Sequence, residues 1–108
     1  MTLPSPGIRF SAMVDFDRGA LARLCREHDV VRLRIFGSAA RGEERPDSDV
    51  DLIVEFGRPT GFVELVRFER LLAEIFGRPV DLTTEPGLDP YIRASALASA
   101  SVLYDAAA

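Results

Sequence analysis

The sequence predicts an α/β protein, of the α+β kind, with a small mixed β-sheet flanked by helices. In some segments apolar residues recur at helical spacing, and in others they alternate with polar residues as in half-buried strands. The segments follow in the order helix, strand, short turn, strand, helix, strand, helix, which is typical of helices packed on a sheet. Because the chain has 108 residues, we expect a single domain over 1–108, with an N-terminal extension over 1–13 and a frayed tail over 106–108.

The first helix and the first strand are predicted over 17–28 and 31–36. Helical spacing gives the helix a buried stripe formed by Leu21, Leu24 and Cys25. Alternation with arginines gives the strand an apolar face formed by Val31, Leu33 and Ile35. We therefore expect Cys25 to be a core residue and not a nucleophile.

A second strand and a long amphipathic helix are predicted over 50–56 and 62–76. One face of the strand carries Val50, Leu52, Val54 and Phe56, and the other carries Asp51, Ile53 and Glu55. The apolar side of the helix is formed by Leu65, Phe68, Leu72, Ile75 and Phe76. Gly77 is suited to the C-terminal cap of this helix, and Pro79 prevents its continuation.

The last third of the chain predicts three shorter elements. A strand is expected over 80–84, where Val80 and Leu82 alternate with an aspartate. Asp89 before a proline is typical of an N-cap followed by the first helical residue, which predicts a helix over 90–100. A last short strand is predicted over 101–104.

Composition and charge narrow the function classes. The chain is 47% hydrophobic with a net charge of −4, so it lacks the basic surplus expected for general nucleic-acid binding. No apolar run approaches the ~18 residues of a membrane span, and the first residues do not resemble a signal peptide. The single cysteine excludes an intrachain disulfide and suits a reducing compartment. These features predict a cytoplasmic protein that does not bind membranes.

Two aspartates follow the connection between the first two strands, which is predicted as a helical turn over 39–41 and a charged loop over 42–48. Because strand side chains alternate, Asp49 and Asp51 can lie on one face, with Cα atoms roughly 6.6 Å apart. Two like charges held this close require a cation, and Mg²⁺ prefers carboxylate and phosphate oxygens. The pair is therefore a candidate metal site, with turn capping as the alternative.

Asp81 is a third candidate because it opens the strand predicted over 80–84. If that strand pairs beside the one over 50–56, Asp81 faces the same cleft as the first two aspartates. Three aspartates with two Mg²⁺ ions suit in-line phosphoryl or nucleotidyl transfer. The alternative is that Asp81 is an exposed strand residue without a catalytic role.

The Gly-Ser step that ends the first strand is a candidate binding site for a triphosphate. Gly37 allows close approach of the backbone to a phosphate, and Ser38 adds a hydroxyl donor while capping the turn. Arg41 is placed to offer a forked cationic contact. Ser48 completes the nucleotide-binding candidates, although orientation of the loop is its simpler role.

These residues together resemble the signature of the polymerase-beta-like nucleotidyltransferase superfamily, in the order GSAARG, SDVDLIVEF and VDLTT. The resemblance extends from the first helix to the last and points to the minimal nucleotidyltransferase (MNT) branch. It implies the polymerase-beta-like fold and metal binding by Asp49 and Asp51. It also implies that Asp81 completes the metal-binding triad and assists deprotonation of an acceptor hydroxyl, while Ser38 contacts the nucleotide.

The MNT branch implies a partner and a reaction. Its members commonly act as antitoxins of HEPN toxins and transfer AMP from ATP to a tyrosine of the toxin. Such a role is compatible with a short acidic chain that has no obvious room for an RNA-binding or acceptor-binding domain. A small-molecule acceptor and a non-catalytic antitoxin that masks its partner are the alternatives. The acceptor residue, the number of nucleotides transferred and the oligomeric state are open.

Overall fold

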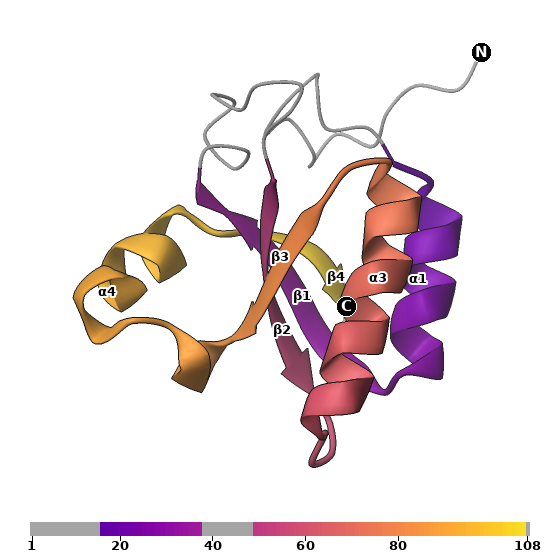
Figure 1. Ribbon diagram of the computed structural model, residues 1–108, viewed down its shortest axis with the longest axis horizontal. Helices are drawn as coiled ribbons and strands as arrows, with labels where there is room; N and C mark the ends of the chain where they lie inside the picture. Colours follow the sequence, from indigo (N-terminus) through magenta and orange to yellow (C-terminus); the bar gives the residue numbers. More distant parts are fainter. Residues whose placement is uncertain (1–15, 38–48, 108) are drawn as a thin grey trace.

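A four-stranded mixed sheet, in the order β3-β2-β1-β4, forms the centre of the structure (Figure 1). The computed structural model describes residues 16–37 and 49–107. The strands are β1 (Val30–Phe36), β2 (Val50–Phe56), β3 (Val80–Thr84) and β4 (Ser101–Asp105). Strand β1 pairs antiparallel with β2 and with β4, whereas β3 pairs parallel with β2. The prediction of a small mixed sheet is thus confirmed.

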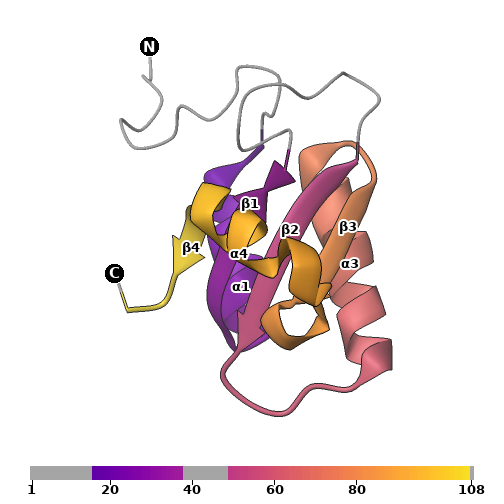
Figure 2. The same ribbon diagram turned by 90° about the vertical axis from the view of Figure 1, so that its left-hand side faces the viewer.

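Helices cover both faces of this sheet (Figures 1 and 2). On one face lie α1 (Arg18–Glu27) and α3 (Phe62–Phe76), and on the other lies α4 (Pro90–Ser99). A short 3₁₀ turn, η1 (Glu85–Gly87), connects β3 to the segment before α4 and was not predicted. Among the described residues, no helix is both long and apolar enough to span a bilayer.

The predicted caps Asp89 and Gly77 are confirmed, and Asp17 caps α1, which was not predicted. Asp17 accepts a hydrogen bond from the Ala20 amide at 3.0 Å, and Asp89 accepts one from the Tyr91 amide at 2.9 Å. Both carboxylates therefore satisfy an amide that the first helical turn leaves free. Gly77 ends α3 in the left-handed region, at φ 70°, and its amide binds the Ala73 carbonyl.

The main core lies between the sheet and the α1–α3 layer. It contains the predicted apolar faces of β2, α1 and α3, and Leu33 and Ile35 of the predicted β1 face, with Phe68 completely buried. The Phe68 ring contacts Phe56 edge-on, at a centroid distance of 5.8 Å, and lies 5.0 Å from the His28 ring. Cys25 is also completely buried, and burial raises the pKa of its thiol to about 12. Its prediction as a core residue is confirmed.

A second, smaller core forms under α4. Ile53 packs there with Leu88 and Ala96, and Phe36 and Leu97 contact the cluster. Ile53 belongs to the face of β2 that also carries Asp51, so α4 covers part of the face on which the candidate aspartates lie.

The start of β1 differs from the prediction. The strand begins at Val30, which is buried, whereas Val31 is only half-buried. The pairing of β1 with β2 shifts register between Val30 and Arg32, and this irregularity turns Val31 out of the expected alternation.

Two residues of the predicted frayed tail are held by hydrogen bonds. Ala106 donates to the Val31 carbonyl at 2.9 Å, and Ala107 donates to the Asp105 carboxylate at 2.9 Å. The predicted extension over 1–13, turn over 39–41 and loop over 42–48 lie outside the described residues.

Phe68 should dominate the stability of the α3–sheet packing. We expect Phe68→Ala to lower the free energy of unfolding by about 3–5 kcal/mol, because it leaves a cavity among completely buried neighbours. Phe62→Ala, in the same helix but 77% exposed, should change it by less than about 0.5 kcal/mol. Urea denaturation of both variants checks this, and equal losses would contradict the assignment of the core.

Candidate active site

The parallel pairing of β2 with β3 brings two of the candidate aspartates together. Asp51 and Asp81 are register partners, and the Val50 amide donates to the Pro79 carbonyl at 2.9 Å where the pairing begins. Register partners on neighbouring strands project to the same face of a sheet. The sequence predicted that Asp81 faces the same cleft as Asp51 if β3 pairs beside β2, and β3 does pair beside β2. Asp49 lies two residues before Asp51 and is exposed.

Gly37 lies against the carboxylate of Asp51. It follows Phe36, the register partner of Asp51 on β1, and has a φ of +75°. A Cβ atom at Gly37 would lie 2.7 Å from Oδ2 of Asp51. Glycine is therefore required both by the left-handed backbone and by the space that the carboxylate occupies. The sequence analysis attributed Gly37 to close approach of a phosphate, whereas the contact seen here is with the aspartate itself.

Burial and two neighbouring carboxylates dominate the electrostatics of Asp51. Burial raises the pKa of Asp51, and the negative charges of Asp81 and then Asp49 raise it further. Half-burial weakens hydration of the Asp51 charge, and the two neighbouring carboxylates add repulsion. A cation bound among these oxygens would relieve both effects.

The carboxylate oxygens of Asp49 and Asp51 fit a hard divalent cation. Within residues 16–37 and 49–107, no three His, Cys, Asp or Glu side chains are gathered closely enough to hold a metal ion by themselves. Mg²⁺ commonly takes only one or two protein carboxylates and completes its shell with water and substrate phosphates. Asp49 and Asp51 are therefore suited to hold such an ion jointly with a nucleotide.

Three of the predicted nucleotide-binding residues, Ser38, Arg41 and Ser48, lie outside the described residues. Their roles remain predictions from the sequence.

Arg34 is a charged residue of this face that the sequence analysis did not single out. Its side chain is only 16% exposed, and its Nη2 lies 3.5 Å from Oε1 of Glu85. Its Nε is buried and has no hydrogen-bond partner among the described residues. The alternating pattern of β1 correctly placed Arg34 on the face opposite the main core. Its burial could not be predicted, because it depends on the elements that cover this face.

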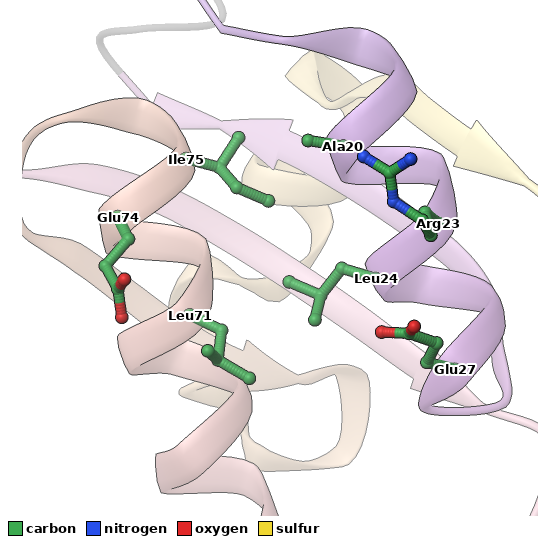
Figure 3. A pocket seen from close by; sticks show the side chains of 7 residues that line it. All are labelled: Ala20, Arg23, Leu24, Glu27, Leu71, Glu74 and Ile75. Carbon is green, nitrogen blue, oxygen red and sulfur yellow. The ribbon is translucent and has the colours of Figure 1, made fainter.

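A groove on the other helical layer is separate from the aspartates. It runs between α1 and α3 and is lined by Ala20, Arg23, Leu24, Glu27, Leu71, Glu74 and Ile75 (Figure 3). The apolar side chains point into the space between the two helices. None of the predicted site residues lines this groove.

Comparisons with known proteins identify the family to which the sequence is similar. The family model described as the nucleotidyltransferase domain matches residues 18–103. MJ0435 of Methanocaldococcus jannaschii, provisionally named a protein adenylyltransferase, is 40% identical over 67 residues, which are 62% of this chain and 72% of that protein.

Solved structures resemble the fold as well. A chain provisionally described as a minimal nucleotidyltransferase has a TM-score of 0.67 at 42% identity, covering 78% of this chain and 86% of its own. A chain from a toxin–antitoxin crystal structure with AMP-PNP has a TM-score of 0.69 at 18% identity, covering 82% of this chain and 73% of its own. At that identity, the second likeness concerns the fold alone.

The raised pKa of Asp51 predicts a pH-dependent effect of its neutralisation in metal-free protein. Because the pKa is higher in the folded state than the ordinary 3.8, the ionised carboxylate opposes folding. Asp51→Asn should therefore increase the free energy of unfolding near neutral pH. The increase should shrink as pH falls through the raised pKa, because the wild-type side chain then becomes protonated as well.

Urea denaturation over this pH range, with a chelator present, measures the effect. Glu74→Gln is the matched control, since Glu74 is an exposed carboxylate on α3, and it should change stability little at any pH. A variant less stable than wild type near neutral pH would contradict the electrostatics described for Asp51.

Proposed function

The chain belongs to the nucleotidyltransferase domain family, and from this premise we propose that it transfers AMP from ATP to a hydroxyl group of a partner protein. The observation that carries the proposal is the register pairing of Asp51 with Asp81, beside a glycine that leaves room for the Asp51 carboxylate. The family match supports the reaction class, and MJ0435, by its provisional name, supports a protein as the acceptor.

Asp49 and Asp51 are proposed to hold Mg²⁺ together with the nucleotide. When bound, the ion would offset the negative charge of the triphosphate and of the leaving phosphates. The half-buried Asp51 needs such a charge most, because burial and both neighbouring carboxylates raise its pKa. Ser38 and Arg41 are proposed to contact the phosphates, and Ser48 to orient the loop that carries them.

Asp81 is proposed to act on the acceptor. Its carboxylate is exposed on the face shared with Asp51, so an incoming hydroxyl can reach it from solvent. As the hydroxyl oxygen bonds to the α-phosphorus of ATP, its proton passes to the Asp81 carboxylate. The bond from the α-phosphorus to the bridging oxygen breaks, and pyrophosphate leaves with the electron pair. The product is a phosphodiester that joins AMP to the acceptor.

The acceptor is proposed to be a tyrosine of a HEPN-type toxin, with this chain as the antitoxin. The motif resemblance to the MNT branch supports the partner class. A toxin–antitoxin chain with the same fold, solved with the ATP analogue AMP-PNP, is consistent with both the partner and the nucleotide.

Removing the two metal-binding carboxylates should abolish transfer. We expect Asp49→Asn with Asp51→Asn to lower the rate of AMP labelling of the partner toxin by about a hundredfold or more, because the site loses its cation. Asp105→Asn, which changes a carboxylate of β4 that pairs with Arg32 of β1, is the control and should retain labelling. The measurement follows transfer of label from α-labelled ATP to a HEPN-type toxin, in the presence of Mg²⁺ and the purified chain.

The same assay separates the alternatives. Undiminished labelling by the double variant would refute the assigned roles of Asp49 and Asp51. Turnover of a small hydroxyl compound without toxin labelling would favour a small-molecule acceptor. Full neutralisation of the toxin by a variant that transfers no AMP would favour masking by binding.

Gly37 offers a second test with an internal control. Gly37→Ala and Gly77→Ala both place alanine at a positive φ, 75° and 70°, so both should lose roughly 1 kcal/mol of stability from backbone strain, and Gly37→Ala should lose more because its Cβ meets Asp51. Only Gly37 faces Asp51, since nothing lies within 4 Å of a Cβ at Gly77. We expect AMP transfer to fall at least about tenfold in Gly37→Ala and to be retained in Gly77→Ala. Equal activity of the two variants in folded protein would contradict the role given to Gly37.

A further inference from the structure

Strand β3 carries Asp81 but has only one neighbour in the sheet. The order β3-β2-β1-β4 makes it an edge strand, beside α3 in both views (Figures 1 and 2). It spans only five residues, Val80–Thr84. Within residues 16–37 and 49–107, no strand binds its outer backbone groups, and short edge strands are held less firmly than central ones. The position of Asp81 therefore depends on whatever else holds β3.

Glu69 of α3 binds the open edge of β3. Its Oε2 accepts a hydrogen bond from the Leu82 amide at 2.9 Å, in a partly buried position. An ionised acceptor makes this hydrogen bond stronger than one between neutral groups. Helix α3 is also the connection between β2 and β3, so the bond ties the edge strand to the segment that leads into it.

The bound amide belongs to the residue directly after Asp81. Amides of successive strand residues point to opposite edges, so an outward Leu82 amide directs those of Asp81 and Thr83 toward β2. A slip by one residue would move Asp81 to the other face of the sheet. The outward Leu82 amide bound by Glu69 is incompatible with a one-residue slip, and in the observed register Asp81 lies opposite Asp51.

We propose that Glu69 is a positioning residue, which holds Asp81 opposite Asp51 by binding the Leu82 amide at the open edge of the sheet. Its effect on catalysis rests on the proposed function, because that function makes Asp81 the proton acceptor. The hydrogen bond itself is independent of the reaction.

Three substitutions of Glu69 distinguish the effect of losing the hydrogen bond from the effects of losing the charge or changing helix propensity. Glu69→Gln keeps an oxygen acceptor, whereas Glu69→Met and Glu69→Ala remove it and retain good helix formers. Glu74→Met is the matched control, because Glu74 is an exposed glutamate of the same helix, beside the groove between α1 and α3 (Figure 3). Each full-length protein is examined by amide hydrogen exchange in NMR, by urea denaturation and in the AMP-transfer assay.

Loss of the Glu69 acceptor oxygen should change both the exchange rate of the Leu82 amide and the rate of AMP transfer. We expect exchange of the Leu82 amide to accelerate about tenfold or more in Glu69→Met and Glu69→Ala, as expected when one hydrogen bond is lost. In the same variants kcat should fall at least about tenfold, with the KM for ATP nearly unchanged, because Asp49 and Asp51 are carried by the central strand β2. Glu69→Gln should restore both exchange protection and kcat, and Glu74→Met should match wild type.

Several results would overturn the proposal. Unchanged Leu82 exchange in Glu69→Ala would mean that the bond does not hold the strand. Faster exchange without a fall in kcat would make Glu69 a structural residue only, as would equal defects in Glu69→Gln and Glu69→Met. If wild-type protein transfers no AMP, the proposed function fails, while the exchange measurements still decide whether Glu69 holds β3 in place.

Discussion

The parallel register of β2 and β3 is the constraint on which the rest of the site depends. It places two carboxylates, Asp51 and Asp81, side by side on one face of the sheet. Burial and the charges of Asp81 and Asp49 raise the pKa of Asp51, so this arrangement is electrostatically unfavourable until a cation binds. Unfavourable electrostatics of this kind are typical of sites that bind a charged ligand. The register itself is maintained by the apolar residues of β3, which pack toward the main core, and by helix α3, which leads into the strand.

One face of the sheet contributes most of the hydrophobic core, and the other carries the candidate catalytic aspartates. The face under α1 and α3 is almost entirely apolar and contains the main core. Among the described residues, α4 covers part of the other face through the cluster around Ile53, and Asp49 and Asp81 are exposed. Asp51, in contrast, is half-buried. Its half-buried position weakens hydration and so strengthens its interaction with a bound cation.

Much of the fold could be predicted from the sequence because it depends on local patterns. Capping residues such as Asp89 and Gly77 marked helix ends, and alternation identified β2 and β3 with their aspartates. What escaped prediction depends on contacts between distant segments. The irregular start of β1 at Val30 arises from its pairing with β2, and the contact of Gly37 with Asp51 arises where the two strands meet. The nucleotide-binding roles of Ser38, Arg41 and Ser48 stay predictions.

The central claim is that the aspartates hold a cation and a nucleotide on the face of the sheet shared by β2 and β3. A crystal structure of the chain with Mn²⁺ and a non-hydrolysable ATP analogue tests it most directly, since anomalous scattering locates the metal. The account predicts Mn²⁺ bound to carboxylate oxygens of Asp49 and Asp51 and to the triphosphate, with the α-phosphate facing Asp81. Metal and nucleotide bound elsewhere, such as in the groove between α1 and α3, with all three aspartates free of ligand, would contradict it.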